Sequence, residues 1–196
     1  MFMNERLTVP FSLDFNLVTG LCDSGKAQPT RRYVSDMIDQ FYDRGAAEAI
    51  VKDGDKLLYA FYELERIPEQ PGELRFGTSI VYPGMVGDEY FMTKGHFHTI
   101  IETAEVYCCL SGEGYMLMET PEGDVRLLPM KPGDCVYVPP RYAHRSINTG
   151  AAPLVLFFAF PADAGHDYGT IEKKGYRKLL VNKEGKPTLV DNPRWE

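Results

Sequence analysis

The sequence has few of several residues and patterns that identify common protein classes. Its 196 residues include only four histidines, four cysteines and one tryptophan. Its longest uninterrupted apolar run, Leu154 to Phe160, has seven residues, whereas a membrane-spanning helix needs about 20. We therefore expect no membrane span. The first residues carry both charge signs and lack an apolar stretch followed by small residues, so we also expect no signal peptide and a cytoplasmic location.

Basic residues are in the minority. The chain has 21 Lys and Arg against 28 Asp and Glu, a net charge of −7. Such a surface repels a polyanion, which argues against a nucleic-acid partner, and any phosphate-bearing ligand must be held by a local site. The hydrophobic share of 44% and charged share of 25% are typical of a globular chain that buries a core, and the length fits one domain.

The four cysteines form no C-x-x-C pair. They are Cys22, Cys108, Cys109 and Cys135, and neighbouring Cys108 and Cys109 would point to opposite faces of a strand. Because disulfides are rare in a reducing cytosol, we expect buried free thiols.

The chain after residue 55 has the pattern of an antiparallel β protein. Short apolar or alternating runs rich in Val, Tyr, Phe and Thr are separated by Gly, Pro and Asp, and the turn sequences at 120–124 and 131–134 favour hairpins. Nine strands predict a barrel or sandwich, and a hairpin from Lys178 to Val190 follows. The expected strands are Lys56–Glu65, Leu74–Val81, Glu89–Thr93, Ala104–Leu110, Tyr115–Glu119, Val125–Met130, Cys135–Val138, His144–Asn148 and Pro153–Phe160.

The region before residue 56 has a different pattern. The first 32 residues are broken by Pro and Gly and predict irregular or edge structure that wraps the main domain. Apolar residues between Tyr33 and Val51 recur at helical spacing, interrupted at Gly45, and predict the one helical stretch.

Three of the four histidines fall in two clusters. His96 and His98 form an H-x-H pair followed by Glu105, and His144 comes much later. Residues i and i+2 of a strand face the same side, so His96 and His98 would share a cavity. Glu105 follows His98 by seven residues, which is long enough for a turn, and opens the next strand. His144 would come from a distant strand.

Three imidazoles and one carboxylate suit Fe(II), Mn(II), Ni(II) or Zn(II) and leave two positions of an octahedral ion for substrate oxygens or water. That would be a catalytic site. The alternative is that these histidines are core or surface residues with satisfied hydrogen bonds, which the addition of Glu105 and His144 makes less attractive.

At these residues the chain resembles the cupins. The spacings Glu105-x6-Gly112, Gly133-x5-Pro139 and His144-x3-Asn148 match the cupin motifs, although Glu105 lies further from His98 than usual and Tyr90 stands in place of a glycine. The resemblance implies an all-β fold, the cupin double-stranded β-helix or jelly-roll barrel, with an N-terminal extension and one short helical segment. We expect a single domain over residues 1–196, with its barrel core at about 56–160 and the segments 1–55 and 161–196 packed on it.

The surrounding sequence narrows the resemblance to the archaeal cupin-type glucose-6-phosphate isomerases. Segments similar to that family run through most of the chain, and include residues 82–87, 91–98, 104–107, 136–140, 161–170 and 191–195. The resemblance implies a homodimeric enzyme that interconverts glucose 6-phosphate and fructose 6-phosphate. It also implies one divalent metal ion per subunit, with Fe(II) as the expected ion.

The resemblance also implies roles for individual residues. By this match His96, His98, Glu105 and His144 correspond to metal ligands, and Glu105, Tyr107 and His166 to catalytic residues. Substrate contacts correspond to Tyr59, Ser79, Thr93, Gly95 and Tyr168, where Ser79 replaces a threonine. Phe160 stands where the family has a tyrosine at the phosphate end, which removes one hydroxyl.

Several alternatives remain open at this level. The reaction could pass through a cis-enediol with Glu105 as base, or through a hydride shift. Strand alternation points Lys94 away from Thr93, which favours a solvated surface charge. The same four ligands on Fe(II) would also suit a dioxygenase, and a barrel that binds a sugar phosphate without turnover would be a sensor.

Overall fold

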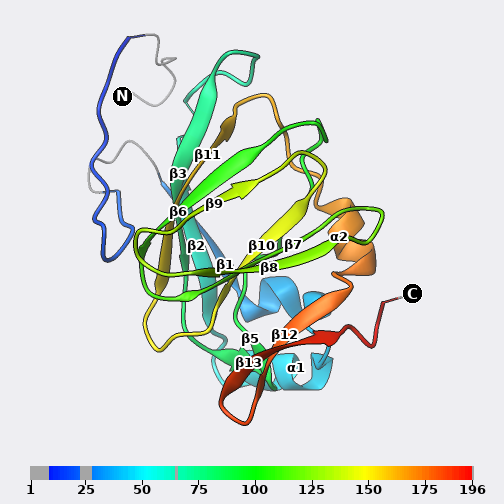
Figure 1. The fold of residues 1–196 in the computed structure, drawn as a ribbon. Coiled ribbons are helices and arrows are strands. Elements are labelled where there is room, and N and C mark those ends of the chain that lie inside the picture. The colour runs from blue at the N-terminus through cyan, green and yellow to red at the C-terminus, as the bar shows by residue number, and fades with distance from the viewer. Residues whose placement is uncertain (1–8, 23–27, 65, 196) are drawn as a thin grey trace.

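The strands of the molecule pair in three antiparallel sheets (Figure 1). The computed structural model describes residues 9–22, 28–64 and 66–195. A six-stranded sheet has the order β1-β2-β3-β11-β6-β9, a three-stranded sheet the order β10-β7-β8, and a four-stranded sheet the order β13-β12-β5-β4. The strands are β1 (Pro29–Tyr33), β2 (Leu57–Glu63), β3 (Leu74–Val81), β4 (Met85–Val86), β5 (Glu89–Tyr90), β6 (Glu105–Ser111), β7 (Gly114–Glu119), β8 (Val125–Met130), β9 (Cys135–Val138), β10 (Ala143–Asn148), β11 (Leu154–Pro161), β12 (Lys178–Lys183) and β13 (Lys186–Asp191).

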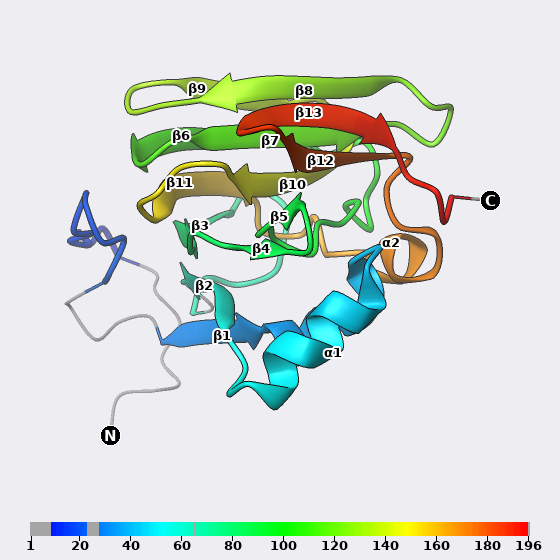
Figure 2. The same ribbon diagram turned by 90° about the horizontal axis from the view of Figure 1, so that it is seen from below.

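The six-stranded and three-stranded sheets form the jelly-roll barrel expected from the cupin resemblance. Strands distant in sequence alternate in the larger sheet, where β11 lies between β3 and β6. The segment between β5 and β6 joins β10 through the bridges Met92↔Ile147 and His96↔His144. Buried Asn148 ties β10 to β3, because its side chain donates to Val81 O at 2.7 Å. Figure 2 shows the strands stacked, with α1 (Arg44–Lys52) beside β1, far from β8 and β9.

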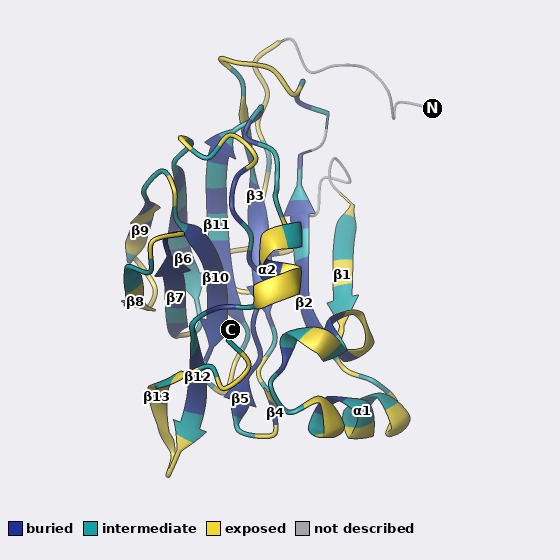
Figure 3. Cartoon of the chain, turned by 90° about the vertical axis from the view of Figure 1, so that its right-hand side faces the viewer, coloured by how far each residue is buried: buried dark blue, intermediate teal, exposed yellow. Residues whose placement is uncertain are grey.

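Alternation along the strands places apolar and functional side chains inside the barrel. In β6 the residues Glu105, Tyr107 and Cys109 are buried while those between them are half-buried, as the period of two predicts. Every residue of β10 is buried, because this strand is covered on both faces. Figure 3 shows the burial concentrated along the strands, with the helices exposed on their outer sides.

The predicted strands are found, with some changes in length. The expected strand Glu89–Thr93 is reduced to β5, and Met92 makes only an isolated bridge. The C-terminal hairpin is confirmed as β12 and β13, and the predicted edge segment contains β1, which pairs with β2. Parts of the predicted N-terminal arm, residues 1–8 and 23–27, and the end of the first predicted strand at Glu65 lie outside the described residues.

The prediction of a single short helical segment was wrong. The predicted stretch forms a 3-10 helix, η1 (Val34–Gln40), and α1, and a further helix, α2 (Gly169–Lys174), follows the barrel. The break falls before Gly45 because Asp43 caps α1 by accepting a hydrogen bond from Ala46 N at 2.9 Å. Helix α2 buries only Ile171 and is too short to show periodicity. Within the described residues no helix has the length and apolar character needed to cross a bilayer.

All four cysteines are free thiols, as expected. Cys22 and Cys109 are buried, but Cys108 is half-buried and Cys135 is exposed. The prediction of burial was therefore wrong for Cys135, which lies on the outer face of β9, opposite Cys108 in the ladder.

Candidate functional site

The four predicted metal ligands meet inside one end of the barrel. His96 and His98 lie between β5 and β6, Glu105 begins β6, and His144 lies in β10. One potential ligand atom from each of the four lies within 4.8 Å of the others. The main chains of His96 and His144 are directly bridged, since His144 N donates to His96 O at 3.2 Å. The strand pairing thus produces the constellation that spacing alone suggested.

Backbone carbonyls orient two of the imidazoles. His98 Nδ1 lies 3.1 Å from Thr103 O, and His144 Nδ1 lies 3.4 Å from Tyr142 O. A carbonyl only accepts, so Nδ1 carries hydrogen in both rings and a neutral ring presents the Nε2 lone pair. These Nε2 atoms lie 3.1 and 2.9 Å from Glu105 Oε2. Three electron-rich atoms this close require a proton or a metal cation among them.

The carboxylate of the cluster is ionised and its His96 imidazole is neutral. Burial would raise the pKa of Glu105, but His144 and His98 outweigh it and hold this pKa well below its usual value, so the carboxylate is ionised. Burial, with His144 and His166 nearby, lowers the pKa of His96 well below its usual value. The buried Nε2 of neutral His96 has no hydrogen-bond partner among the described residues. The donor set, three imidazoles and one carboxylate, fits a divalent transition-metal ion.

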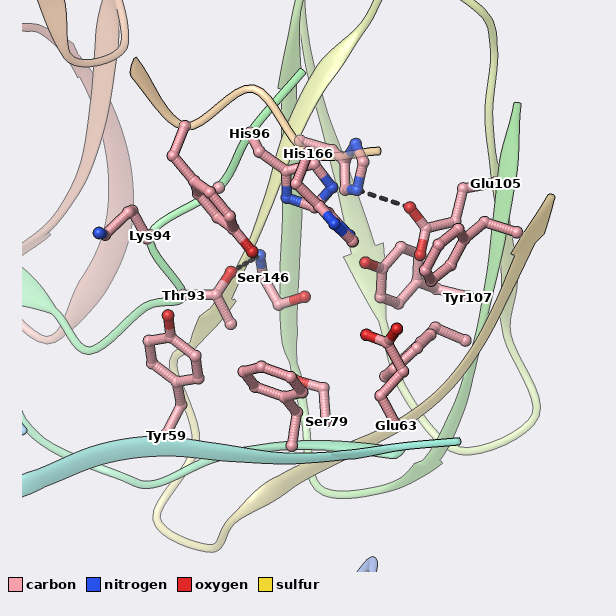
Figure 4. A pocket seen from close by; sticks show the side chains of 16 residues that line it. Tyr59, Glu63, Ser79, Thr93, Lys94, His96, Glu105, Tyr107, Ser146 and His166 are labelled. Carbon is pink, nitrogen blue, oxygen red and sulfur yellow. Dashed lines mark hydrogen bonds and ion pairs between the residues drawn. The ribbon is translucent and has the colours of Figure 1, made fainter. Parts of the chain in front are cut away.

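A pocket opens from this cluster into the barrel (Figure 4). Every predicted site residue lines this pocket except His98, which lines a neighbouring cavity. The lining residues are Tyr59, Phe61, Glu63, Ser79, Thr93, Lys94, Gly95, His96, Glu105, Tyr107, His144, Ser146, Phe158, Phe160, His166 and Tyr168.

Aromatic side chains surround the cluster. The His166 ring lies 4.4 Å from that of His96 and 5.7 Å from that of Tyr168, on which it stacks. Burial lowers the pKa of His166 to about 4, so its imidazole is neutral at neutral pH. Burial and the adjacent Glu105 raise the pKa of Tyr107 well above its usual value, and burial raises that of Tyr168 to about 12. Both phenols therefore keep their protons and can donate hydrogen bonds.

Hydroxyl groups line the other part of the pocket. Thr93 Oγ1 accepts a hydrogen bond from Ser146 N at 3.0 Å, which leaves the Thr93 hydroxyl hydrogen for a ligand. Ser79 and Tyr59 contribute hydroxyls from β3 and β2, and burial raises the pKa of Tyr59. This end of the pocket offers neutral donors with Lys94 beside them.

Gly95 connects the two ends of the pocket. Its φ of +76° is unfavourable for other residues, and a Cβ there would lie 2.4 Å from Tyr176 Oη and 2.8 Å from His144 O. Glycine is therefore required by both conformation and space. That Gly95 contacts the substrate stays a prediction.

The prediction for Lys94 was wrong, and the prediction that Phe160 removes a phosphate contact stays a prediction. The Phe160 ring lies 6.0 Å from that of His98 and 5.3 Å from that of His166. The hydroxyl that it lacks is therefore missing beside the metal-ligand cluster. Lys94 is not a solvated surface charge, because its side chain is 18% exposed, lines the pocket and pairs with Glu172 at 2.7 Å.

Sequence reasoning missed four lining residues: Phe61, Glu63, Ser146 and Phe158. Ser146 lies two positions after His144, and Phe61 and Glu63 lie two and four positions after Tyr59. The resemblance did not point to these residues, but strand alternation from Tyr59, His144 and Phe160 would have selected them.

The barrel and its three-histidine, one-glutamate cluster define a cupin with a candidate metal centre. The model of the glucose-6-phosphate isomerase family matches residues 31–195. A glucose-6-phosphate isomerase of Thermococcus litoralis is 47% identical over 95% of this chain and 96% of its own length. One of Sinorhizobium medicae is 37% identical over 97% and 89%. The chain belongs to the glucose-6-phosphate isomerase family and is an enzyme of that family.

Among solved structures, a deletion mutant of Bacillus subtilis oxalate decarboxylase matches with a TM-score of 0.42 and 23% identity. The match covers 55% of this chain and 27% of that one.

Proposed function

We propose that this enzyme interconverts glucose 6-phosphate and fructose 6-phosphate with the help of a divalent metal ion held by His96, His98, Glu105 and His144. The observation that carries the proposal is the convergence of these four side chains at one end of a pocket whose other end presents neutral hydroxyls. The curated relatives share the activity in their names and match nearly the whole chain.

The donor set accepts Fe(II), Mn(II), Ni(II) or Zn(II), and the family resemblance favours Fe(II). A divalent ion bound there would supply Lewis acidity toward the carbonyl and hydroxyl oxygens of C1 and C2. Ligation would also reduce the basicity of Glu105, so its role as a ligand competes with a role as general base.

The residues around the cluster supply the remaining chemistry. The ionised Glu105 is the candidate base for a proton moving between C1 and C2, in a route through a cis-enediol. In a hydride shift, Glu105 would act as a ligand only. In both routes the protonated Tyr107 donates a hydrogen bond to a substrate oxygen, and neutral His166 accepts or relays a proton at the sugar.

The phosphate would occupy the end formed by Tyr59, Ser79, Thr93 and Ser146. Four hydroxyl donors can hold a phosphate without a large basic patch, which agrees with the acidic surface of the chain. The ion pair of Lys94 with Glu172 leaves the local charge near zero.

The proposal extends to a homodimer in the cytoplasm, which rests on the family resemblance. Analytical ultracentrifugation of the purified protein would test the dimer: a molar mass twice that of the 22.2 kDa chain supports it, and the mass of one chain contradicts it.

A direct experiment uses the metal-loaded enzyme with fructose 6-phosphate in deuterated water. Formation of glucose 6-phosphate, detected with a dehydrogenase, is the expected result, and its absence would overturn the proposal. The product also separates the two routes: deuterium at C2 supports proton transfer, whereas a product without deuterium supports the hydride shift.

A further inference from the structure

Glu63 places an acidic side chain inside the pocket, and the function described so far does not use it. It lines the pocket and its side chain is only 10% exposed. Figure 4 shows its carboxylate directed into the cavity from the strand that also carries Tyr59. A buried carboxylate in a site for an anionic substrate opposes binding unless it makes a specific contact.

The strand register places Glu63 between the two ends of the pocket. Glu63 lies opposite Gly77, Gly77 opposite Phe158, and Phe158 opposite Tyr107. This row crosses four strands of the six-stranded sheet. Gly77 has no side chain, and the Phe158 ring packs close to it, because a Cβ at Gly77 would lie 3.0 Å from Phe158 Cζ.

The neighbouring rows mark the two ends of the pocket. Glu105 and Phe160 lie two residues from this row in one direction along the strands, at the metal-ligand cluster. Ser79 lies two residues from the row in the other direction, at the hydroxyl end. The two ends are thus separated by about 13 Å, four residues of strand. A sugar phosphate that spans them places its middle carbons at the row of Glu63 and Tyr107.

An ion pair fixes the orientation of Glu63. Arg75 Nη1 donates to Glu63 at 2.9 Å, and Arg75 Nη2 contacts Glu69 at 2.7 Å. The side chains of Arg75 and Glu63 are only 13% and 10% exposed, whereas that of Glu69 is 68% exposed. Arg75 therefore holds the Glu63 carboxylate in one place on the pocket wall, where it can act as a preorganised acceptor.

We propose that Glu63 determines specificity by accepting a hydrogen bond from a hydroxyl at C3 or C4 of the open-chain sugar phosphate. This inference rests on the proposed function and adds a contact to it. A carboxylate accepts hydrogen bonds and cannot donate, so it selects hydroxyls over a phosphate oxygen at this level of the pocket. Tyr107, in the same row on the opposite side, supplies the complementary donor.

The test measures binding of two inert ligands by calorimetry in the metal-loaded enzyme. Sorbitol 6-phosphate has the hydroxyls and the phosphate but no carbonyl, and inorganic phosphate lacks the hydroxyls. For Glu63→Ala we expect the Kd of sorbitol 6-phosphate to rise at least tenfold, since hydrogen bonds to charged groups are strong. The Kd of phosphate should stay the same or fall, because a negative charge has been removed.

Two further variants keep the test decisive. Glu63→Gln preserves the shape and an acceptor for Arg75, and should give a smaller rise, about threefold to tenfold, in a protein that folds normally. Glu69→Gln removes the other carboxylate beside Arg75 and should change neither Kd.

An unchanged Kd for sorbitol 6-phosphate in both Glu63 variants would overturn the inference. An equal rise in the Kd of sorbitol 6-phosphate and of phosphate would also overturn it, because it indicates a structural role. If the unaltered enzyme also turns over fructose 6-phosphate, the proposed function survives. A wild type that binds neither ligand would overturn both.

Discussion

Replacing Gly95 by alanine should damage both the fold and the metal-ligand cluster. The added Cβ would lie 2.4 Å from Tyr176 Oη, 2.8 Å from His144 O and 3.0 Å from Arg145 Cβ. Tyr176 and Arg145 are fully buried, so they have little room to move. The carbonyl of His144 cannot shift without moving the imidazole beside it.

The magnitude has two parts. A left-handed conformation costs a residue other than glycine about 1–2 kcal/mol, and overpacking a closed site costs about 1–3 kcal/mol. Gly95→Ala should therefore lower the free energy of unfolding by about 2–5 kcal/mol, which corresponds to a drop in Tm of about 5–15 °C for a chain of this size.

Gly133→Ala is the matched control. Gly133 also has a positive φ, +94°, but a Cβ there meets nothing within 4 Å. It should lose only the conformational part, about 1–2 kcal/mol, and keep its activity. The assays are urea denaturation, metal content and kcat/KM with fructose 6-phosphate. Equal losses of stability in the two variants, with full activity in Gly95→Ala, would refute the steric reasoning.

Three further predictions concern single side chains. His144→Ala should lose bound metal and activity together, and full metal content measured by mass spectrometry would remove His144 from the ligand set. Tyr107→Phe should lower kcat at least tenfold with unchanged metal content, and an unchanged kcat would reduce this hydroxyl to packing. Burial raises the pKa of Glu89 to about 7 despite the nearby Arg145. The stability that Glu89 gives to the fold is complete below pH 4.5 and lost as pH rises through 7, a change of about 3 kcal/mol. Glu89→Gln should remove this dependence in urea titrations at pH 5 and pH 8, and a wild-type slope in the variant would contradict it.

The candidate metal ligands could be predicted because their chemistry is encoded locally. The alternation of His96 and His98 put both rings on one face, and scarce histidines left His144 as the natural partner. Their actual meeting depends on the bridge between His96 and His144, which joins segments 48 residues apart. Clustering and alternation proposed these four ligands, and the family resemblance implied the same four.

The features that could not be predicted depend on register across strands or on local capping. The position of Phe160 along the barrel is set by its pairing with Arg75 on β3, whereas Ser79 pairs with Leu156. This register could not be derived from the sequence. Lys94 lies after β5 in irregular structure, where strand alternation does not apply. Helix α2 is fixed by a hydrogen bond from Thr170 to Asp167 rather than by an apolar face.

The most direct test of the account is metal dependence of isomerisation. The enzyme would be stripped with a chelator, reloaded separately with Fe(II), Mn(II), Ni(II) or Zn(II), and assayed with fructose 6-phosphate while metal content is measured on the same samples. We predict that turnover is lost with the metal and returns in proportion to bound ion, to a limit of one per chain. Full turnover in the stripped enzyme, or no turnover with any ion at full occupancy, would contradict the account.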